Sequence, residues 1–271
     1  MSSGRFVDFF YNQQVFEGNV EKRHQNTTNV LYLYPDNHTR STQTMIADLH
    51  SHTYYSHCGR DLPETVIETA IQHKIDVLGI TDHNYGIGER KREYRERMTY
   101  LKEKYASQII LLCGIEISTL PHLYDIKEGE IDDYDYCLLE HIDHEESIAY
   151  HNFFGFSSKL PIKVGVAHTD LFAYAGKIGM TPQAFFKQMA EQNIFWEMNV
   201  SYDSIHGYRE HQYYKTFFQN EEQQAIVKQA GTVLSVGFDG HRVEDYRGDR
   251  VKEACEFLQQ RGFSLTHETF F

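Results

Sequence analysis

Proline and cysteine are both scarce in this chain of 271 residues, which has five prolines and four cysteines. So few prolines, together with 18 Phe and 19 Tyr, are not typical of a long disordered segment. The cysteines form no C-x-x-C pair, and three of the four lie in stretches with a strand or helix pattern. We therefore expect Cys58, Cys113, Cys137 and Cys255 to be free thiols, mostly buried, in a reducing cytosol.

A basic surface is also missing, because 39 acidic residues outnumber 26 Lys and Arg to give a formal net charge of −13. A general nucleic-acid surface would need a basic stripe, and none is visible. A phosphorylated substrate must then be met by bound cations and a few arginines. No apolar run approaches membrane-spanning length and no signal pattern opens the chain, so we expect a soluble cytoplasmic protein. The sequence is silent on oligomeric state.

Residues 1–44 are polar apart from an aromatic group formed by Phe6, Phe9, Phe10 and Tyr11. Exposed aromatic side chains would be costly, so we expect an N-terminal extension that packs on the main domain. A segment of this length is too short to favour a separate folded domain. The main domain is predicted to span residues 45–271.

From Met45 onward, short continuous apolar runs alternate with stretches of helical periodicity. Continuous runs are typical of strands buried on both faces, and they occupy residues 45–49, 75–80, 109–117, 134–139, 162–167, 194–200 and 232–238. Helix starts are indicated at Pro63 and Pro182, and helix ends at Gly231 and Gly262. The alternation predicts an α/β fold with a parallel sheet, and seven strands favour a closed or nearly closed barrel.

Nine side chains with metal-ligand chemistry lie where these strands are predicted to end. They are His50, His52, His57, His83, Glu116, His141, His168, Asp239 and His241. Barrel enzymes build their sites at the carboxyl ends of the strands, so we expect the nine to meet there. Nine donors exceed the needs of one four-coordinate ion and suit two or three ions that share a bridging carboxylate.

Glu116 is the natural bridging carboxylate, because a glutamate on the inward face of an apolar run is costly unless it is paired or bound to metal. A structural salt bridge is the alternative interpretation. His50 and His52 have the i, i+2 spacing that places both on one side of a strand, and Asp48 could orient one of these imidazoles. Asp82 is either a helix cap or a similar orienting acceptor.

Two further candidates lie after the sixth predicted strand. His206 and Arg209 belong to a tyrosine-rich loop on the expected active face. Two interpretations of this loop are open: its side chains contact the substrate, or it is a solvated loop without a role. The other histidines outside the nine are expected to be surface or loop residues.

These elements together resemble the PHP (polymerase and histidinol phosphatase) superfamily from about Ala47 to His241. The pattern D-x-H-x-H-T begins at Asp48, T-D-H ends at His83, and G-x-E ends at Glu116. His141 and His168 match later strand-end histidines, and D-x-H matches Asp239 and His241. The resemblance implies a distorted seven-stranded (β/α)7 TIM-like barrel holding two or three ions.

The resemblance also implies how the ions are shared. His50, His52, Glu116 and Asp239 would hold one ion; Glu116, His141 and His168 a second; and His57, His83 and His241 a third. His57 and Cys58 compete by register for one position. We prefer His57, because imidazole suits a mixed nitrogen and oxygen site better than a lone thiolate.

The chemistry implied is hydrolysis of a small-molecule phosphate monoester by water activated on divalent zinc, manganese or iron, as in histidinol phosphatases. No phosphate-cradling glycine loop or nucleophilic Ser or Cys with a base is visible, which favours direct hydrolysis. The catalytic candidates are Glu116, His206 and Arg209, the last two also contacting substrate. A phosphatase for nucleotides or another phosphate ester, and a catalytically silent metal-binding module, remain alternatives. A polymerase-associated editing role is disfavoured by the missing polymerase domain and basic surface.

Overall fold

The computed structural model of the protein describes residues 45–270. The predicted N-terminal extension, residues 1–44, lies outside the described residues. Between Met45 and Phe270, no helix has the length and apolar character needed to cross a membrane.

The seven predicted strands are present and are all parallel. In chain order they are β1 (Ala47–Asp48), β2 (Val77–Ile80), β3 (Ile110–Ser118), β4 (Tyr136–Glu140), β5 (Lys163–Val166), β6 (Phe195–Asn199) and β7 (Leu234–Gly237). Each strand pairs with the next along the chain, in the order β1 to β7. The predicted parallel α/β arrangement is therefore confirmed.

The first and last strands approach each other, so the sheet curves into a nearly closed barrel. Leu49 N donates to Val236 O at 2.9 Å, and Asp239 N donates to His50 O at 2.7 Å just beyond the two strands. Asp48 reinforces this seam, since its carboxylate accepts from Phe238 N at 2.9 Å. The result is the distorted (β/α)7 barrel that the family resemblance implied.

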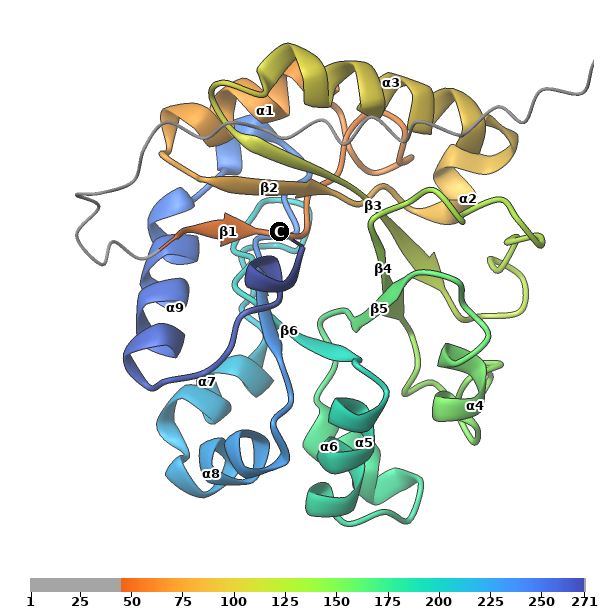
Figure 1. Ribbon diagram of the computed structural model, residues 1–271, viewed down its shortest axis with the longest axis vertical. Helices are drawn as coiled ribbons and strands as arrows, with labels where there is room; N and C mark the ends of the chain where they lie inside the picture. The colour runs from red at the N-terminus through yellow and green to blue at the C-terminus, as the bar shows by residue number, and fades with distance from the viewer. Residues whose placement is uncertain (1–44, 271) are drawn as a thin grey trace, which may run out of the picture. The chain divides into compact units, whose positions relative to one another are not determined.

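Helices surround the strands, as Figure 1 shows for the coloured part of the chain. The α-helices are α1 (Pro63–Gln72), α2 (Asn84–Ile87), α3 (Lys91–Tyr105), α4 (Phe153–Ser157), α5 (Leu171–Lys177), α6 (Pro182–Glu191), α7 (Gln212–Gln219), α8 (Glu221–Ala230) and α9 (Gly248–Gln260). Short 3-10 turns lie at Gly88–Arg90, Val243–Asp245 and Thr266–Thr269. The predicted starts at Pro63 and Pro182 are confirmed, and Thr181 caps the second of these helices by accepting from Ala184 N.

The barrel interior is packed with side chains rather than open. Tyr136 is buried there and its hydroxyl donates to Leu49 O at 2.7 Å. Gly79 and Gly114 make room for its ring, because a Cβ at Gly79 would lie 1.8 Å from the Tyr136 hydroxyl and one at Gly114 2.7 Å from its ring. Because the interior is filled, polar side chains can gather only at the carboxyl ends of the strands.

All four cysteines are free, as expected. Cys113, Cys137 and Cys255 are buried, and burial raises the pKa of the Cys255 thiol to about 12. Cys58 is only partly buried and lies in the loop that follows β1. It is the one cysteine whose position departs from the buried pattern.

Candidate metal centre

The predicted donors follow the carboxyl ends of the strands or, for Glu116, lie within β3. Their order along the barrel is His50, His52 and His57 after β1, His83 after β2, His141 after β4, His168 after β5, and Asp239 and His241 after β7. His141, His168 and Asp239 have positive φ angles of 63°, 20° and 58°. Such backbone is costly for residues other than glycine and is held in place mainly at functional sites.

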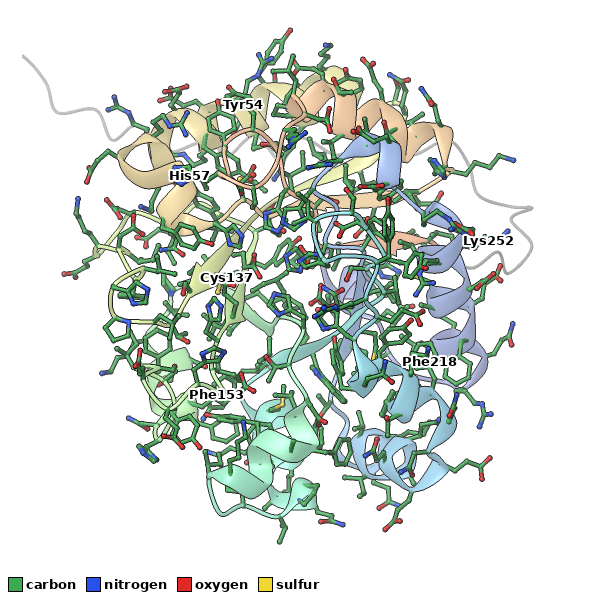
Figure 2. All side chains as sticks on the ribbon, turned by 180° about the vertical axis from the view of Figure 1, so that it is seen from behind. Tyr54, His57, Cys137, Phe153, Phe218 and Lys252 are labelled. Atoms are coloured by element: carbon green, nitrogen blue, oxygen red, sulfur yellow. The ribbon has the colours of Figure 1, made fainter. Side chains whose placement is uncertain are left out.

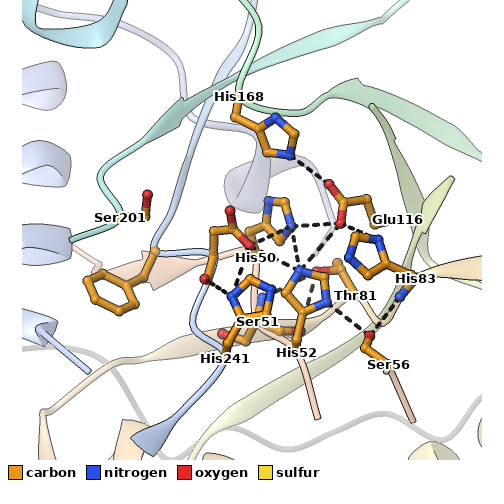
Figure 3. A network of polar contacts seen from close by, with 12 residues as sticks. His50, Ser51, His52, Ser56, Thr81, His83, Glu116, His168, Ser201 and His241 are labelled. Atoms are coloured by element: carbon orange, nitrogen blue, oxygen red, sulfur yellow. Dashed lines mark hydrogen bonds and ion pairs between the residues drawn. The ribbon is translucent and has the colours of Figure 1, made fainter. Parts of the chain in front are cut away.

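Glu116 lies at the centre of the group, and its two carboxylate oxygens face different histidines. Oε1 lies 2.9 Å from Nε2 of His168. Oε2 lies 2.9 Å from Nδ1 of His83 and 3.4 Å from Nε2 of both His50 and His52. Figure 3 shows Glu116 between His168 on one side and these three imidazoles on the other. A carboxylate shared in this way has the geometry required for the predicted bridging role.

Asp239 completes the group around the first two histidines. Its Oδ1 lies 3.0 Å from Nε2 of His52 and 3.5 Å from Nε2 of His50. The two Nε2 atoms are 3.1 Å apart, and all these side chains are buried. The structure therefore brings together the four residues predicted to share one ion, which are His50, His52, Glu116 and Asp239.

Outer polar groups fix the orientation of these imidazoles. Glu197 on β6 places Oε1 2.7 Å from Nδ1 of His50. Ser56 Oγ lies 3.1 Å from Nδ1 of His52 and donates to the buried carboxylate of Asp82 at 2.7 Å. Because Nδ1 of each ring has a partner, Nε2 is the nitrogen left to face the centre. Outer partners of this kind fix the tautomer of metal-binding histidines.

Asp82 and Asp48 bind backbone groups, and neither contacts an imidazole directly. Asp82 accepts from Thr53 N at 2.7 Å and Ser56 N at 3.0 Å, so it holds the loop after β1. The helix-cap interpretation of Asp82 is wrong, because α2 begins at Asn84 without a side-chain cap. Asp48 accepts from the backbone N of His50 at 3.2 Å, and its other partners are Phe238 N and the Tyr246 hydroxyl. The suggestion that Asp48 orients an imidazole ring is therefore wrong.

Burial and mutual charge determine the protonation of the group. Burial lowers the pKa of His50, but the surrounding carboxylates, Glu197 foremost, raise it well above its ordinary value. Burial raises the pKa of Glu116, but His50 and His83 outweigh this and hold it well below its usual range. Burial and two neighbouring imidazoles lower the pKa of His52 to about 3. Metal binds to ionised carboxylate and neutral imidazole, so the shifts favour the binding forms of Glu116 and His52, whereas His50 would release a proton on binding metal.

A second group of donors lies beside the first. His52, Cys58, His83 and His241 each offer one ligand atom, and these atoms lie within 4.8 Å of one another. The side chain of His57, labelled in Figure 2, is exposed instead and belongs to none of the groups of potential ligands among the described residues. The structure thus places Cys58, rather than the preferred His57, beside His83 and His241, because consecutive side chains in the loop point in different directions.

His141 is the other predicted donor that the structure does not bring into a group. Its Nδ1 lies 3.0 Å from Ser118 Oγ and 3.3 Å from Glu140 Oε2, and the side chain is 27% exposed. Its neighbour Glu140 points inward, where Oε1 lies 3.4 Å from Nδ1 of His83. His83, Glu116 and Glu140 form a further group of potential ligands. The metal-binding role of His141 stays a prediction.

Of the two loop candidates, His206 reaches the centre and Arg209 does not. His206 Nδ1 lies 2.8 Å from Asp203 Oδ1, and its Nε2 lies 3.9 Å from Asp239 Oδ2. The hydrogen bond to Asp203 raises the pKa of His206. Asp203 also lies 3.5 Å from Nδ1 of His241, which donates to Asp239 O at 2.9 Å. Arg209 is exposed, and within residues 45–270 its side chain has no ion pair.

Besides Asp203 and Glu140, two further contributors were missed from the sequence. Glu197 is buried in the apolar run that forms β6, and its Oε2 also accepts from His168 N at 2.7 Å. An inward glutamate in an apolar run was the signal used for Glu116 and could have identified Glu197 as well. His211 stacks on His168 with ring centroids 5.6 Å apart, and burial lowers its pKa to about 4. No local pattern distinguishes His211 from the surface histidines.

The residues present fit divalent metal ions. Imidazole nitrogens and carboxylate oxygens converge in a buried place, and this donor set suits zinc, manganese or iron. His83 Nδ1 and Glu140 Oε1 are buried without a hydrogen-bond partner, although the first lies 2.9 Å from Glu116 Oε2. Short approaches without hydrogen-bond geometry are expected where the atoms point at a shared ion rather than at each other.

A parallel (β/α)7 barrel with histidines and carboxylates gathered at the strand ends is the architecture of a metal-binding barrel protein. The family model for the PHP domain matches residues 48–260, and the chain belongs to this family. No curated protein matches the sequence significantly.

Solved structures with a similar fold include histidinol phosphate phosphatases. The one from Lactococcus lactis, in complex with zinc, L-histidinol and phosphate, has a TM-score of 0.59 and 15% sequence identity, over 82% of this chain and 95% of that chain. A candidate histidinol phosphatase from Listeria monocytogenes has a TM-score of 0.49 and 15% identity, over 73% and 96% of the two chains. The likeness to the Lactococcus enzyme concerns the fold alone.

Proposed function

We propose that the protein is a metal-dependent phosphoesterase that hydrolyses a small-molecule phosphate monoester, in the manner of a histidinol phosphatase. The observation that carries the proposal is Glu116, whose two buried oxygens face separate sets of nitrogen donors at the carboxyl ends of the strands. Bound divalent ions would supply positive charge to the phosphoryl oxygens and lower the pKa of a water molecule at the site.

The ligands proposed for these ions are the residues that the structure gathers. They are His50, His52, His83, Glu116, His168, Asp239 and His241. Glu197 and Ser56 hold the outer nitrogens of His50 and His52, and the backbone carbonyl of Asp239 holds Nδ1 of His241, so these imidazoles are in position before substrate arrives.

His206 is proposed to protonate the leaving oxygen of the ester. Its Nδ1 is held by Asp203, which raises the pKa of the ring and leaves Nε2 to face Asp239. Arg209 would contribute by contacting phosphate from the same loop. With a net charge of −13, the protein depends on such local positive charge to capture an anion.

The fold likeness to the Lactococcus enzyme, whose structure holds L-histidinol and phosphate, supports a small phosphomonoester as substrate. A nucleotide or another phosphate ester fits the same chemistry. A silent metal-binding module is the alternative from another class, and the buried donor set around Glu116 argues against it, because binding alone does not need a bridging carboxylate with two donor sets.

A phosphatase assay tests the proposal directly. The full-length protein, stripped of metal with a chelator and reconstituted with zinc, manganese or iron, should hydrolyse at least one member of a panel of phosphate monoesters that includes histidinol phosphate and nucleotides. Removal of metal should abolish turnover, and Glu116→Gln is the matched negative control. Metal uptake without turnover on any ester would favour the silent module and contradict the proposal.

A further inference from the structure

Cys58 is the one cysteine of residues 45–270 that is not buried in the core, and its thiol lies among histidines of the metal centre. Its Sγ and one nitrogen from each of His52, His83 and His241 lie within 4.8 Å of one another. A free, partly exposed thiol ordinarily has no such neighbours. The arrangement is that of a set of ligands around a common point.

The loop that carries Cys58 is tied down on both sides. Tyr54 N donates to Asp61 O at 2.8 Å, which closes the loop at its base. Asp82 holds Thr53 through both its backbone N and its hydroxyl, each at 2.7 Å. Gly59 packs directly against Thr53, because a Cβ added at Gly59 would lie 2.2 Å from Thr53 O. The inward position of Cys58 is therefore built into the fold.

The hydrogen bonds around the histidines show which donors remain for Cys58. His52 uses Nδ1 for Ser56, and its Nε2 lies 3.0 Å from Asp239 Oδ1. Nε2 of His52 therefore belongs to the first group of donors, which is formed with His50, Glu116 and Asp239. His241 uses Nδ1 for a backbone carbonyl, which leaves Nε2 free. His83 is 8% exposed, and its Nδ1, which lies 2.9 Å from Glu116 Oε2, makes no hydrogen bond. His83, His241 and the Cys58 sulfur thus remain as one set of possible ligands.

We propose that Cys58 is a thiolate ligand, with His83 and His241, at a third metal position that prefers a thiophilic ion such as zinc. This inference rests on the proposed function for the presence of metal at the centre. Three protein ligands leave one place open in a tetrahedral site, as in catalytic zinc sites. The first group, built from imidazole and carboxylate, would accept harder ions such as manganese, so the two positions would differ in the metal they select.

Cobalt is a direct probe of the thiolate, because a cobalt–sulfur bond produces a near-ultraviolet charge-transfer band. The full-length protein, freed of metal and kept without oxygen, should develop this band as Co²⁺ is added. Cys58→Ser should lack the band and bind about one equivalent less cobalt per chain, since a serine hydroxyl is not ionised at neutral pH. His57→Ala is the matched control and should keep both the band and the cobalt content.

The outcomes separate this inference from the proposed function. Cobalt protein that hydrolyses a phosphate ester but shows no sulfur band would overturn the thiolate ligand and leave the phosphoesterase proposal standing. A band lost in His57→Ala and kept in Cys58→Ser would also overturn it. Failure of the wild-type protein to bind cobalt at all would contradict both proposals.

The wild-type protein offers a test that needs no variant. Iodoacetamide should alkylate Cys58 readily in metal-free protein, and zinc should slow this reaction strongly, because a metal-bound thiolate is protected. Cys113, Cys137 and Cys255 are buried and should remain unmodified in both states, which makes them internal controls. Equal alkylation of Cys58 with and without zinc, measured by peptide mass spectrometry, would overturn the inference.

Discussion

Oε1 of Glu197 lies 2.7 Å from Nδ1 of His50, and this contact joins β6 to the loop after β1 across the barrel. Both side chains are buried, so the contact is shielded from water. The same carboxylate accepts from His168 N through its other oxygen. Glu197 therefore positions two proposed ligands at once, although it is not itself in a group of potential ligands.

Glu197→Gln should weaken metal binding without unfolding the protein. The amide can still accept one hydrogen bond, but it loses the charge that favours the Nδ1-protonated form of His50. Removal of such an outer partner typically costs ten- to a hundredfold in metal affinity, and we expect about that loss. Competition with a chelator measures it. Glu256→Gln, on the exposed face of α9, is the matched control and should bind metal as the wild type does.

Glu116→Gln should have a larger effect, because the change removes charge from the carboxylate that faces both donor sets. We expect loss of at least one bound ion and a decrease in kcat beyond the ten- to hundredfold typical of outer partners. The fold should survive, since the strands and helices supply the core. Elemental analysis and turnover are the measurements, with circular dichroism as the check on folding. Unchanged turnover would remove Glu116 from the site.

The barrel and most of its donor set could be predicted because both depend on periodic patterns. Buried parallel strands give continuous apolar runs, and the residues that follow them must lie at one end of the barrel. The choice between His57 and Cys58 could not be predicted in the same way. It depends on an irregular loop whose course is set by distant groups, such as the Asp82 carboxylate that holds Thr53.

His206→Gln tests the proposed proton donor. The hydrogen bond that His206 Nδ1 donates to Asp203 holds Nε2 of His206 toward Asp239, and glutamine cannot deliver a proton from that place. General acid catalysis typically contributes a hundred- to ten-thousandfold, so kcat should decrease by roughly that factor while metal content stays the same. An activated ester, whose leaving oxygen needs no proton, should be affected much less. Equal losses on both kinds of ester would argue against this role.

Arg209→Ala tests whether the exposed loop after β6 takes part in phosphate recognition. If Arg209 contacts the phosphate, its removal should lower kcat/KM by roughly ten- to a hundredfold, the cost of one charge-assisted hydrogen bond of about 1.5–3 kcal/mol. Metal content should not change. Arg247→Ala, at another exposed arginine, serves as the comparison. Unaltered kinetics would leave phosphate capture to the metals alone.

His267 provides a source of acid sensitivity outside the metal centre. It is 1% exposed, its Nε2 has no hydrogen-bond partner, and burial lowers its pKa to about 4. In the unfolded chain its pKa would be near 6.5. Between these two values the unfolded state binds more protons, so the free energy of unfolding must decrease as pH falls from about 6.5 toward 4.

His267→Gln should remove this part of the pH dependence, because glutamine does not titrate. At about 1.4 kcal/mol per pKa unit, the wild type should lose up to about 3 kcal/mol relative to the variant between neutral pH and pH 4. Denaturant unfolding of both proteins, each freed of metal so that the site histidines contribute equally, measures the difference. The variant is expected to be less stable at neutral pH and to lose less stability in acid. A constant difference across this pH range would show that His267 is not held neutral in the folded protein.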